Sequence, residues 1–124
     1  MKLLTPQEIE VWYLLPAIRK EFAMIMLEHN LSQKDVAKKL YVTEPAISQY
    51  VKNKRAKEVK INEKVREEMK KSVDRIMKNP APQIVIVELQ RILSVMKKEM
   101  ILCDLHRKMD ANIPLQCNEC QKWW

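Results

Sequence analysis

The stretch Ser32–Val51, which reads SQKDVAKKLYVTEPAISQYV, decides the fold of this 124-residue chain. Ser32 and Thr43 each stand directly before a short amphipathic segment, where their hydroxyl groups can cap the first turn of a helix. The pattern predicts one helix that is capped by Ser32 and runs through Leu40, and a second that is capped by Thr43 and runs from residue 44 to about Asn53. Because only three residues join them, the two helices must cross at a steep angle.

A steep crossing needs a small side chain where the helices touch and apolar side chains around it. Ala37 supplies the small contact. Pro45 is tolerated because it falls in the first turn of the second helix. The surrounding core is expected to contain Val36, Leu40, Val42, Ile47 and either Tyr50 or Val51.

A further helix is predicted before this pair. Thr5 and Glu8 form a capping box that starts a helical pattern running to about Asn30. Pro16 lies inside that pattern, so we expect a kink or a break near residues 14–15.

Two more helices are predicted after the pair. The first covers residues 62–78 and ends at the linker Asn79-Pro80-Ala81-Pro82. The second runs from Ile84 to about Met109 as one long helix, with a strand over residues 84–87 as the alternative because that run is rich in β-branched residues. The linker divides the chain into predicted domains of residues 1–79 and 80–124.

The chain contains no glycine, although average usage of about 7% would give roughly nine. Phosphate-binding loops and dinucleotide-binding fingerprints need glycine where the backbone approaches phosphate, so neither is present in its usual form. Tight hairpin turns are also disfavoured. These exclusions favour an all-α fold. Together with the helices predicted above, they give a helix-turn-helix domain, a long C-terminal helix and a short tail.

The charge of the chain points to a polyanionic partner. Lysine and arginine number 23 against 16 acidic residues, which gives a net charge of +7. Residues 52–71 hold nine basic and four acidic residues, and therefore five of the seven net charges. No apolar stretch of about 18 residues and no signal-like N-terminus is found, so we expect no membrane partner and a cytoplasmic location.

Residues 15–60 resemble the helix-turn-helix of lambda-repressor/Cro-type transcriptional regulators, the xenobiotic-response-element family. The resemblance is greatest in Ile47-Ser48-Gln49-Tyr50 and Asn53-Lys54-Arg55. Tyr41 departs from the pattern, because the family commonly has glycine at this turn position. The resemblance implies a protein that binds double-stranded DNA and regulates transcription.

A second helix lying in the major groove presents its N-terminal and outward side chains to the bases. Gln49 can pair with adenine through two hydrogen bonds, and Lys52 can donate to guanine. The candidates for base contact are Glu44, Pro45, Ala46, Ser48, Gln49 and Lys52. The candidates for phosphate contact are Gln33, Lys34, Asn53, Lys54, Arg55 and Lys57.

The long C-terminal helix has apolar residues spaced alternately three and four apart, as in a coiled-coil seam. We expect this seam to pair with a second copy of the chain, because helix-turn-helix proteins usually bind two half-sites. The alternative is a helix packed within its own chain. The seam residues are Ile86, Leu89, Leu93, Met96 and Met100.

The chain ends in the spacing Cys-x2-His-x10-Cys-x2-Cys, formed by Cys103, His106, Cys117 and Cys120. Three thiolates and one imidazole complete a four-ligand set, and the absence of carboxylates favours zinc or, second, an iron-sulfur cluster. A metal-free dithiol switch and cysteines without a special role are the remaining alternatives. This tail resembles that of predicted archaeal regulators of this kind.

Taken together, these features predict a dimeric, sequence-specific transcriptional regulator that senses metal or redox state through its tail. The alternative is an antitoxin or adaptor whose C-terminal segment binds a protein partner while the DNA-binding domain regulates its own gene. Catalysis is not expected and no small-molecule substrate is implied, because Cys103 and His106 have no third orienting group and no evident pocket.

Overall fold

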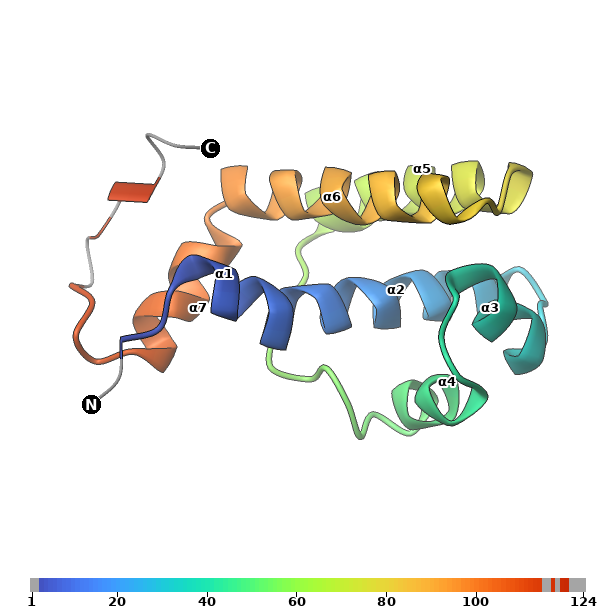
Figure 1. The fold of residues 1–124 in the computed structure, drawn as a ribbon, viewed down its shortest axis with the longest axis horizontal. Helices are drawn as coiled ribbons and strands as arrows, with labels where there is room; N and C mark the ends of the chain where they lie inside the picture. The colour runs from blue at the N-terminus through green and yellow to red at the C-terminus, as the bar shows by residue number, and fades with distance from the viewer. Residues whose placement is uncertain (1–2, 115–116, 118, 121–124) are drawn as a thin grey trace.

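The computed structural model describes residues 3–114, 117, 119 and 120, and this part of the chain contains helices and no strand. The predicted all-α fold is confirmed, and the strand alternative for residues 84–87 is wrong, since they lie in a helix. In chain order the elements are α1 (Pro6–Ile9), the π-helical turn η1 (Glu10–Leu14), α2 (Leu15–Glu28), α3 (Gln33–Leu40), α4 (Glu44–Val51), α5 (Glu63–Lys78), α6 (Pro82–Lys98) and α7 (Ile101–Met109) (Figure 1).

Side-chain caps begin the helices where the sequence predicts them. Thr5 and Glu8 form the full capping box of α1. The side chains of Ser32, Thr43 and Asn62 each accept a hydrogen bond from the backbone N–H three residues later, at the start of α3, α4 and α5. Each cap satisfies a donor that the first helical turn leaves without a partner.

The interruption expected at Pro16 is the π-helical turn η1. Proline has no N–H to donate to the carbonyl of Trp12, four residues earlier. The helical turn before Pro16 instead contains one additional residue, so that the Leu15 N–H donates to the carbonyl of Glu10, five residues earlier. Helix α2 therefore continues directly from η1, which keeps the N-terminal segment attached to the central helix.

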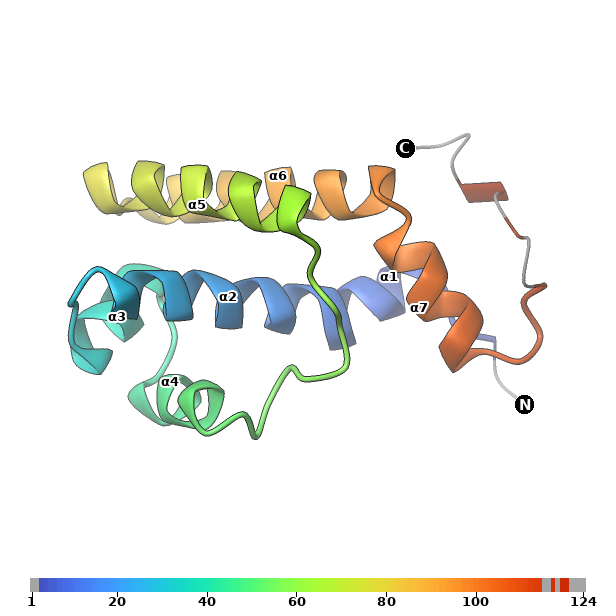
Figure 2. The same ribbon diagram turned by 180° about the vertical axis from the view of Figure 1, so that it is seen from behind.

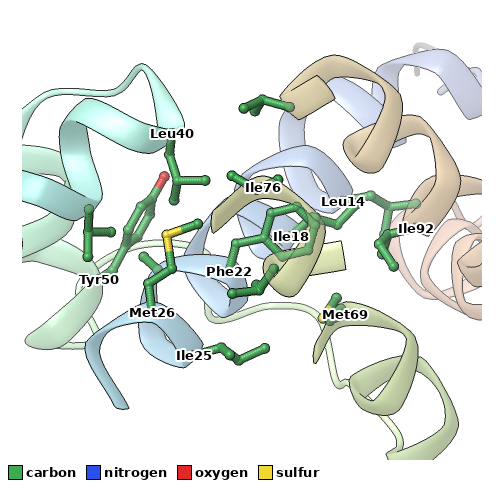
Figure 3. Close-up of a cluster of buried hydrophobic side chains, with 14 of the residues drawn as sticks. Leu14, Ile18, Phe22, Ile25, Met26, Leu40, Tyr50, Met69, Ile76 and Ile92 are labelled. Carbon is green, nitrogen blue, oxygen red and sulfur yellow. The ribbon is translucent and has the colours of Figure 1, made fainter. Parts of the chain in front are cut away.

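Helix α2 lies in the middle of the molecule. Figures 1 and 2 show α5 and α6 along one side of it, and α3 and α4 at its C-terminal end. Its residues Ile18, Phe22 and Met26 are fully buried. Figure 3 shows these side chains between Leu40 and Tyr50 of the α3–α4 pair and Met69, Ile76 and Ile92 of the α5–α6 pair.

The proline-containing linker is a tight turn, and α6 returns antiparallel along α5. The linker does not detach the C-terminal helix from the helices before it. Helix α6 packs against both α5 and α2, and it buries Val85, Ile92 and Met96. The short turn forces the pairing, because it leaves the apolar faces of α5 and α6 side by side.

The long helix predicted to end at about Met109 is in fact two helices. Met100 adopts a left-handed conformation with φ 65° and separates α6 from α7. No glycine or proline marks this break in the sequence, which is why the prediction failed. The break turns α7 toward α1 and buries Leu102 and Leu105 in the common core.

A buried carboxylate joins α5 to α6. The side chain of Glu88 is 3% exposed, and its Oε1 accepts hydrogen bonds from Ser72 Oγ at 2.7 Å, Arg75 at 2.9 Å and Arg91 at 3.1 Å. Burial raises the pKa of Glu88, but these three hydrogen bonds and the charge of Arg91 outweigh it and hold the pKa below its ordinary value of 4.5. The folded protein therefore keeps this carboxylate ionised.

Replacing Glu88 by glutamine is expected to destabilise the fold by about 1–3 kcal/mol at neutral pH, because the hydrogen bonds to a charged acceptor are lost. Since the folded pKa lies below the unfolded one, the carboxylate stabilises the protein above pH 4.5. That contribution is lost as the pH falls through the folded pKa. Urea unfolding followed by circular dichroism at neutral and acidic pH measures both effects.

Glu67→Gln is the matched control, because Glu67 forms an exposed pair with Lys70 on α5 alone. It is expected to change stability by less than about 0.5 kcal/mol. If Glu88→Gln unfolds with the same acid dependence as the original chain, the buried carboxylate does not have this role.

Candidate nucleic-acid interface

The turn between α3 and α4 is made without glycine. Tyr41 takes the left-handed conformation with φ 58°, which costs a residue other than glycine about 1–2 kcal/mol. The Val42 N–H donates to the carbonyl of Ala37 at 3.0 Å and closes the end of α3. The Tyr41 hydroxyl donates to the carbonyl of Pro80 at 2.8 Å, which ties the turn to the α5–α6 connection.

The crossing of α3 and α4 has the core that the sequence predicts. Ala37 is 4% exposed at the contact between the helices. Tyr50 is buried, whereas Val51 is 44% exposed, so Tyr50 is the core residue of that pair. Val36, Leu40 and Ile47 are buried, and Val42 packs partly buried against them.

The outer face of α4 is narrower than predicted. Glu44 and Pro45 are exposed, and Ser48 and Gln49 are half-buried. Ala46 is 6% exposed and belongs to the core. The prediction that Ala46 faces DNA is therefore wrong, because the first turn of α4 packs its small side chain inward beside Ile47.

The side-chain amide oxygen of Gln49, Oε1, is buried without a hydrogen bond to any of the described residues. An unsatisfied buried acceptor costs about 1–3 kcal/mol. Rotation of the side chain outward, toward a base edge, would relieve this cost.

Basic side chains near α4 fall into two groups that the sequence does not separate. Those on α5 are paired: Lys64 with Glu99 at 3.2 Å, Arg66 with Glu21 at 3.3 Å, Lys70 with Glu67 at 3.3 Å, and Lys71 with Glu68 at 3.2 Å. Those between α4 and α5 are exposed and make no ion pair with any residue the structure describes. These are Lys52, Lys54, Arg55, Lys57 and Lys60.

The start of α3 and the end of α4 carry the remaining candidates for phosphate contact. Gln33 and Lys34 are exposed in the first turn of α3. Helix α4 ends at Val51, two residues earlier than predicted, so Lys52 and Asn53 lie in the turn that follows. Asn53 is left-handed with φ 55°, and its side chain accepts a hydrogen bond from Lys20 of α2.

Sequence reasoning missed the contribution of α2 to this surface. Lys20 contacts Asn53 directly. Arg19 lines a hollow of about 400 Å³ together with Trp12, Lys54 and Arg55. The only signal in the sequence was the pair of adjacent basic residues 19–20 on the polar side of the first helix.

The predicted seam on α6 is divided between the interior and the surface. Met96 is fully buried within the chain and is not available to a second copy. Leu89, Leu93 and Met100 are half-buried. Ile86 is 55% exposed, beside an open hollow of about 280 Å³ lined by Tyr41 and Leu89 among others.

Helix α7, which carries Cys103 and His106 of the cysteine motif, lies at the other end of the molecule from α3 (Figure 1). Cys103 and His106 are buried on α7, and Cys117 and Cys120 are half-buried. Burial raises the pKa of the Cys103 thiol, the Arg107 charge opposes this, and Cys120 and Cys117 raise it further. Within the described residues, no three His, Cys, Asp or Glu side chains are gathered closely enough to hold a metal.

Comparison with protein families identifies the segment that contains α3 and α4. Residues 22–76 match a family model described as helix-turn-helix, of the lambda repressor/Cro type. This segment is a helix-turn-helix domain. The domain contains the end of α2, all of α3 and α4, and most of α5. No curated protein and no solved structure matches the chain.

The helix-turn-helix domain indicates a DNA-binding transcription regulator. No helix in the described part of the chain has the length and apolar character needed to cross a membrane.

The unpaired cations after α4 should determine how DNA affinity depends on salt. Lys57→Ala is expected to reduce the slope of log affinity against log salt concentration by about one, because one phosphate contact is lost. Lys70→Ala on α5 should leave the slope unchanged. Fluorescence anisotropy with a labelled duplex at several salt concentrations measures both slopes, and equal reductions would contradict the division into two groups.

Proposed function

We propose that this protein is a sequence-specific transcriptional regulator that places α4 in the major groove of double-stranded DNA. The observation that carries the proposal is the set of exposed, unpaired cations at residues 52–60, directly after α4. In that position they can contact the phosphates that flank the groove while the outer face of α4 meets the bases. The helix-turn-helix match supports the same orientation.

Base recognition is proposed to rest mainly on Gln49, with Ser48, Glu44, Pro45 and Lys52 around it. The buried, unsatisfied Oε1 of Gln49 gains a partner if the amide turns to the N6 and N7 atoms of adenine. Such a bidentate contact discriminates against the wrong base by about 1–3 kcal/mol.

Gln49→Ala is therefore expected to relax sequence preference, whereas Lys54→Ala is expected to weaken binding evenly across sequences. A selection from random duplexes first identifies the preferred site, and titrations on that site and on random duplex then measure both variants. Equal losses on specific and random DNA for Gln49→Ala would refute its assignment to base recognition.

We also propose that two copies of the chain bind together, through α6. The exposed Ile86 and the half-buried Leu89 and Leu93 form a short apolar strip beside the hollow that Tyr41 helps to line. A second copy inserting Ile86 into the hollow of the first would bury this strip on both copies, as two-fold symmetry requires. Met96 stabilises α6 within its own chain and is not part of this contact.

Ile86→Glu is expected to convert the dimer to a monomer, because it would place a charge in the apolar contact. Val87→Glu is the matched control, since Val87 is 50% exposed and lies about 100° around the helix from Ile86. Size-exclusion chromatography with light scattering measures both masses. A monomeric original chain, or equal behaviour of the two variants, would contradict this interface.

A further inference from the structure

Two side chains at the C-terminal end of α7, His106 within the helix and Asp110 at its C-cap, hold the backbone of one residue near the N-terminus. The His106 Nε2 lies 2.6 Å from the carbonyl oxygen of Leu4. The N–H of Leu4 donates to Asp110 Oδ2 at 2.9 Å. Both backbone groups of Leu4 are thus bound to the same helix, which attaches the start of α1 to α7.

This contact decides which nitrogen of His106 carries the proton. A carbonyl oxygen can only accept, so Nε2 must donate and carries the hydrogen. In the neutral imidazole the free electron pair is then on Nδ1. Nδ1 has no hydrogen-bond partner among the described residues. Metal-binding histidines are commonly oriented in this way, with one ring N–H on a backbone carbonyl and the other nitrogen on the metal.

Cys103 lies on α7, as His106 does. Cys103 is buried three residues before His106, so the two share one side of the helix. The guanidinium of Arg107 donates to the backbone carbonyl of Cys117, which holds this residue against α7. Arg107 is itself fixed by Asp104 at 3.1 Å. The four side chains are not gathered closely enough to hold a metal in this structure, so binding requires the thiols of Cys117 and Cys120 to move toward Cys103 and His106.

We propose that a thiophilic divalent metal ion, Zn²⁺ in the first place, binds the thiolates of Cys103, Cys117 and Cys120 and the Nδ1 atom of His106. Three thiolates and one imidazole complete a tetrahedral zinc set. The carbonyl of Leu4 supports the ligand from outside the site by fixing the orientation of the imidazole ring. Binding releases the thiol protons to solvent and draws the tail onto α7.

The metal ion is also proposed to regulate DNA binding, and this part of the inference rests on the proposed function. The side of α7 away from the cysteines contacts the connection between α4 and α5: Asp104, Leu105 and Lys108 line a hollow with Glu58 and Lys60. Figure 2 shows this connection passing beside α7 on its way to α5. A metal ion that fixes α7 also holds the cations of residues 52–60 in place, so the loaded protein binds DNA more tightly.

Titration of the full chain with Co²⁺, without DNA, tests the site directly. The original chain is expected to develop thiolate-to-cobalt charge-transfer and tetrahedral ligand-field bands with one equivalent of metal. Cys117→Ser should lose affinity and part of the charge-transfer intensity. His106→Gln should alter the ligand-field bands, whereas His29→Gln, an exposed histidine outside the motif, should behave as the original chain does.

Unchanged affinity and spectra in Cys117→Ser, or in a folded His106→Gln, would overturn the ligand set. Nitrogen-15 NMR of the zinc-loaded original chain identifies the ligating nitrogen without any substitution. Coordination through Nδ1 supports the proposal, and coordination through Nε2 or no perturbation of the ring overturns it. Bound iron together with visible absorption in anaerobically purified protein would indicate an iron-sulfur cluster in place of zinc. That result would overturn the choice of metal.

DNA affinity of the zinc-loaded and stripped chains then tests the regulation. A difference of about 5- to 150-fold is the range expected for coupled sites, with tighter binding by the loaded chain. Equal affinities overturn the coupling and leave the metal site standing. Absence of DNA binding in both states contradicts the proposed function instead, because the Co²⁺ titration does not depend on DNA.

Discussion

Burial of α2 is the constraint on which the other contacts depend. Its residues Ile18, Phe22 and Met26 are inaccessible to solvent, and α3, α4, α5 and α6 all pack against it. A large-to-small substitution in such a core costs about 2–5 kcal/mol. The same helix therefore positions the α3–α4 pair on one side and the α5–α6 pair on the other. The surface around α4 is in this way fixed relative to the C-terminal half of the chain.

Elements that begin with a local chemical signal were predictable from the sequence. The caps at Ser32, Thr43 and Asn62 each act within three residues, and Pro16 acts on its own turn. The local sequence is therefore sufficient to predict these helix starts and the interruption near Pro16. The break at Met100 has no such signal. It is stabilised by packing of α7 against α1, residues about a hundred positions away, and local patterns do not record that contact. The inward position of Ala46 has the same origin, since tertiary packing decides it.

The candidate site was predictable to a similar extent. Exposure of the cations that follow α4 agrees with their sequence pattern, but the basic residues of α5 cannot be distinguished from them by composition. Arg66 and Lys64 are neutralised by Glu21 and Glu99, which lie far away in the chain. Charge counting along the sequence therefore overstated the length of the positive surface. The cysteine spacing was evident at once, whereas the role of Leu4 beside His106 emerges only from the fold.

The part of the chain that the structure describes makes five left-handed turns without glycine, at Asn30, Tyr41, Asn53, Ala56 and Met100. Asparagine tolerates this conformation, but at Tyr41, Ala56 and Met100 the native state carries strain of about 1–2 kcal/mol each. At positions with an ordinary backbone conformation, a residue other than glycine has the opposite effect, because it leaves the unfolded chain fewer conformations to lose, and this stabilises the fold by about 0.4–1 kcal/mol per position. Part of the stability of this protein thus originates in the restricted conformations of its denatured ensemble.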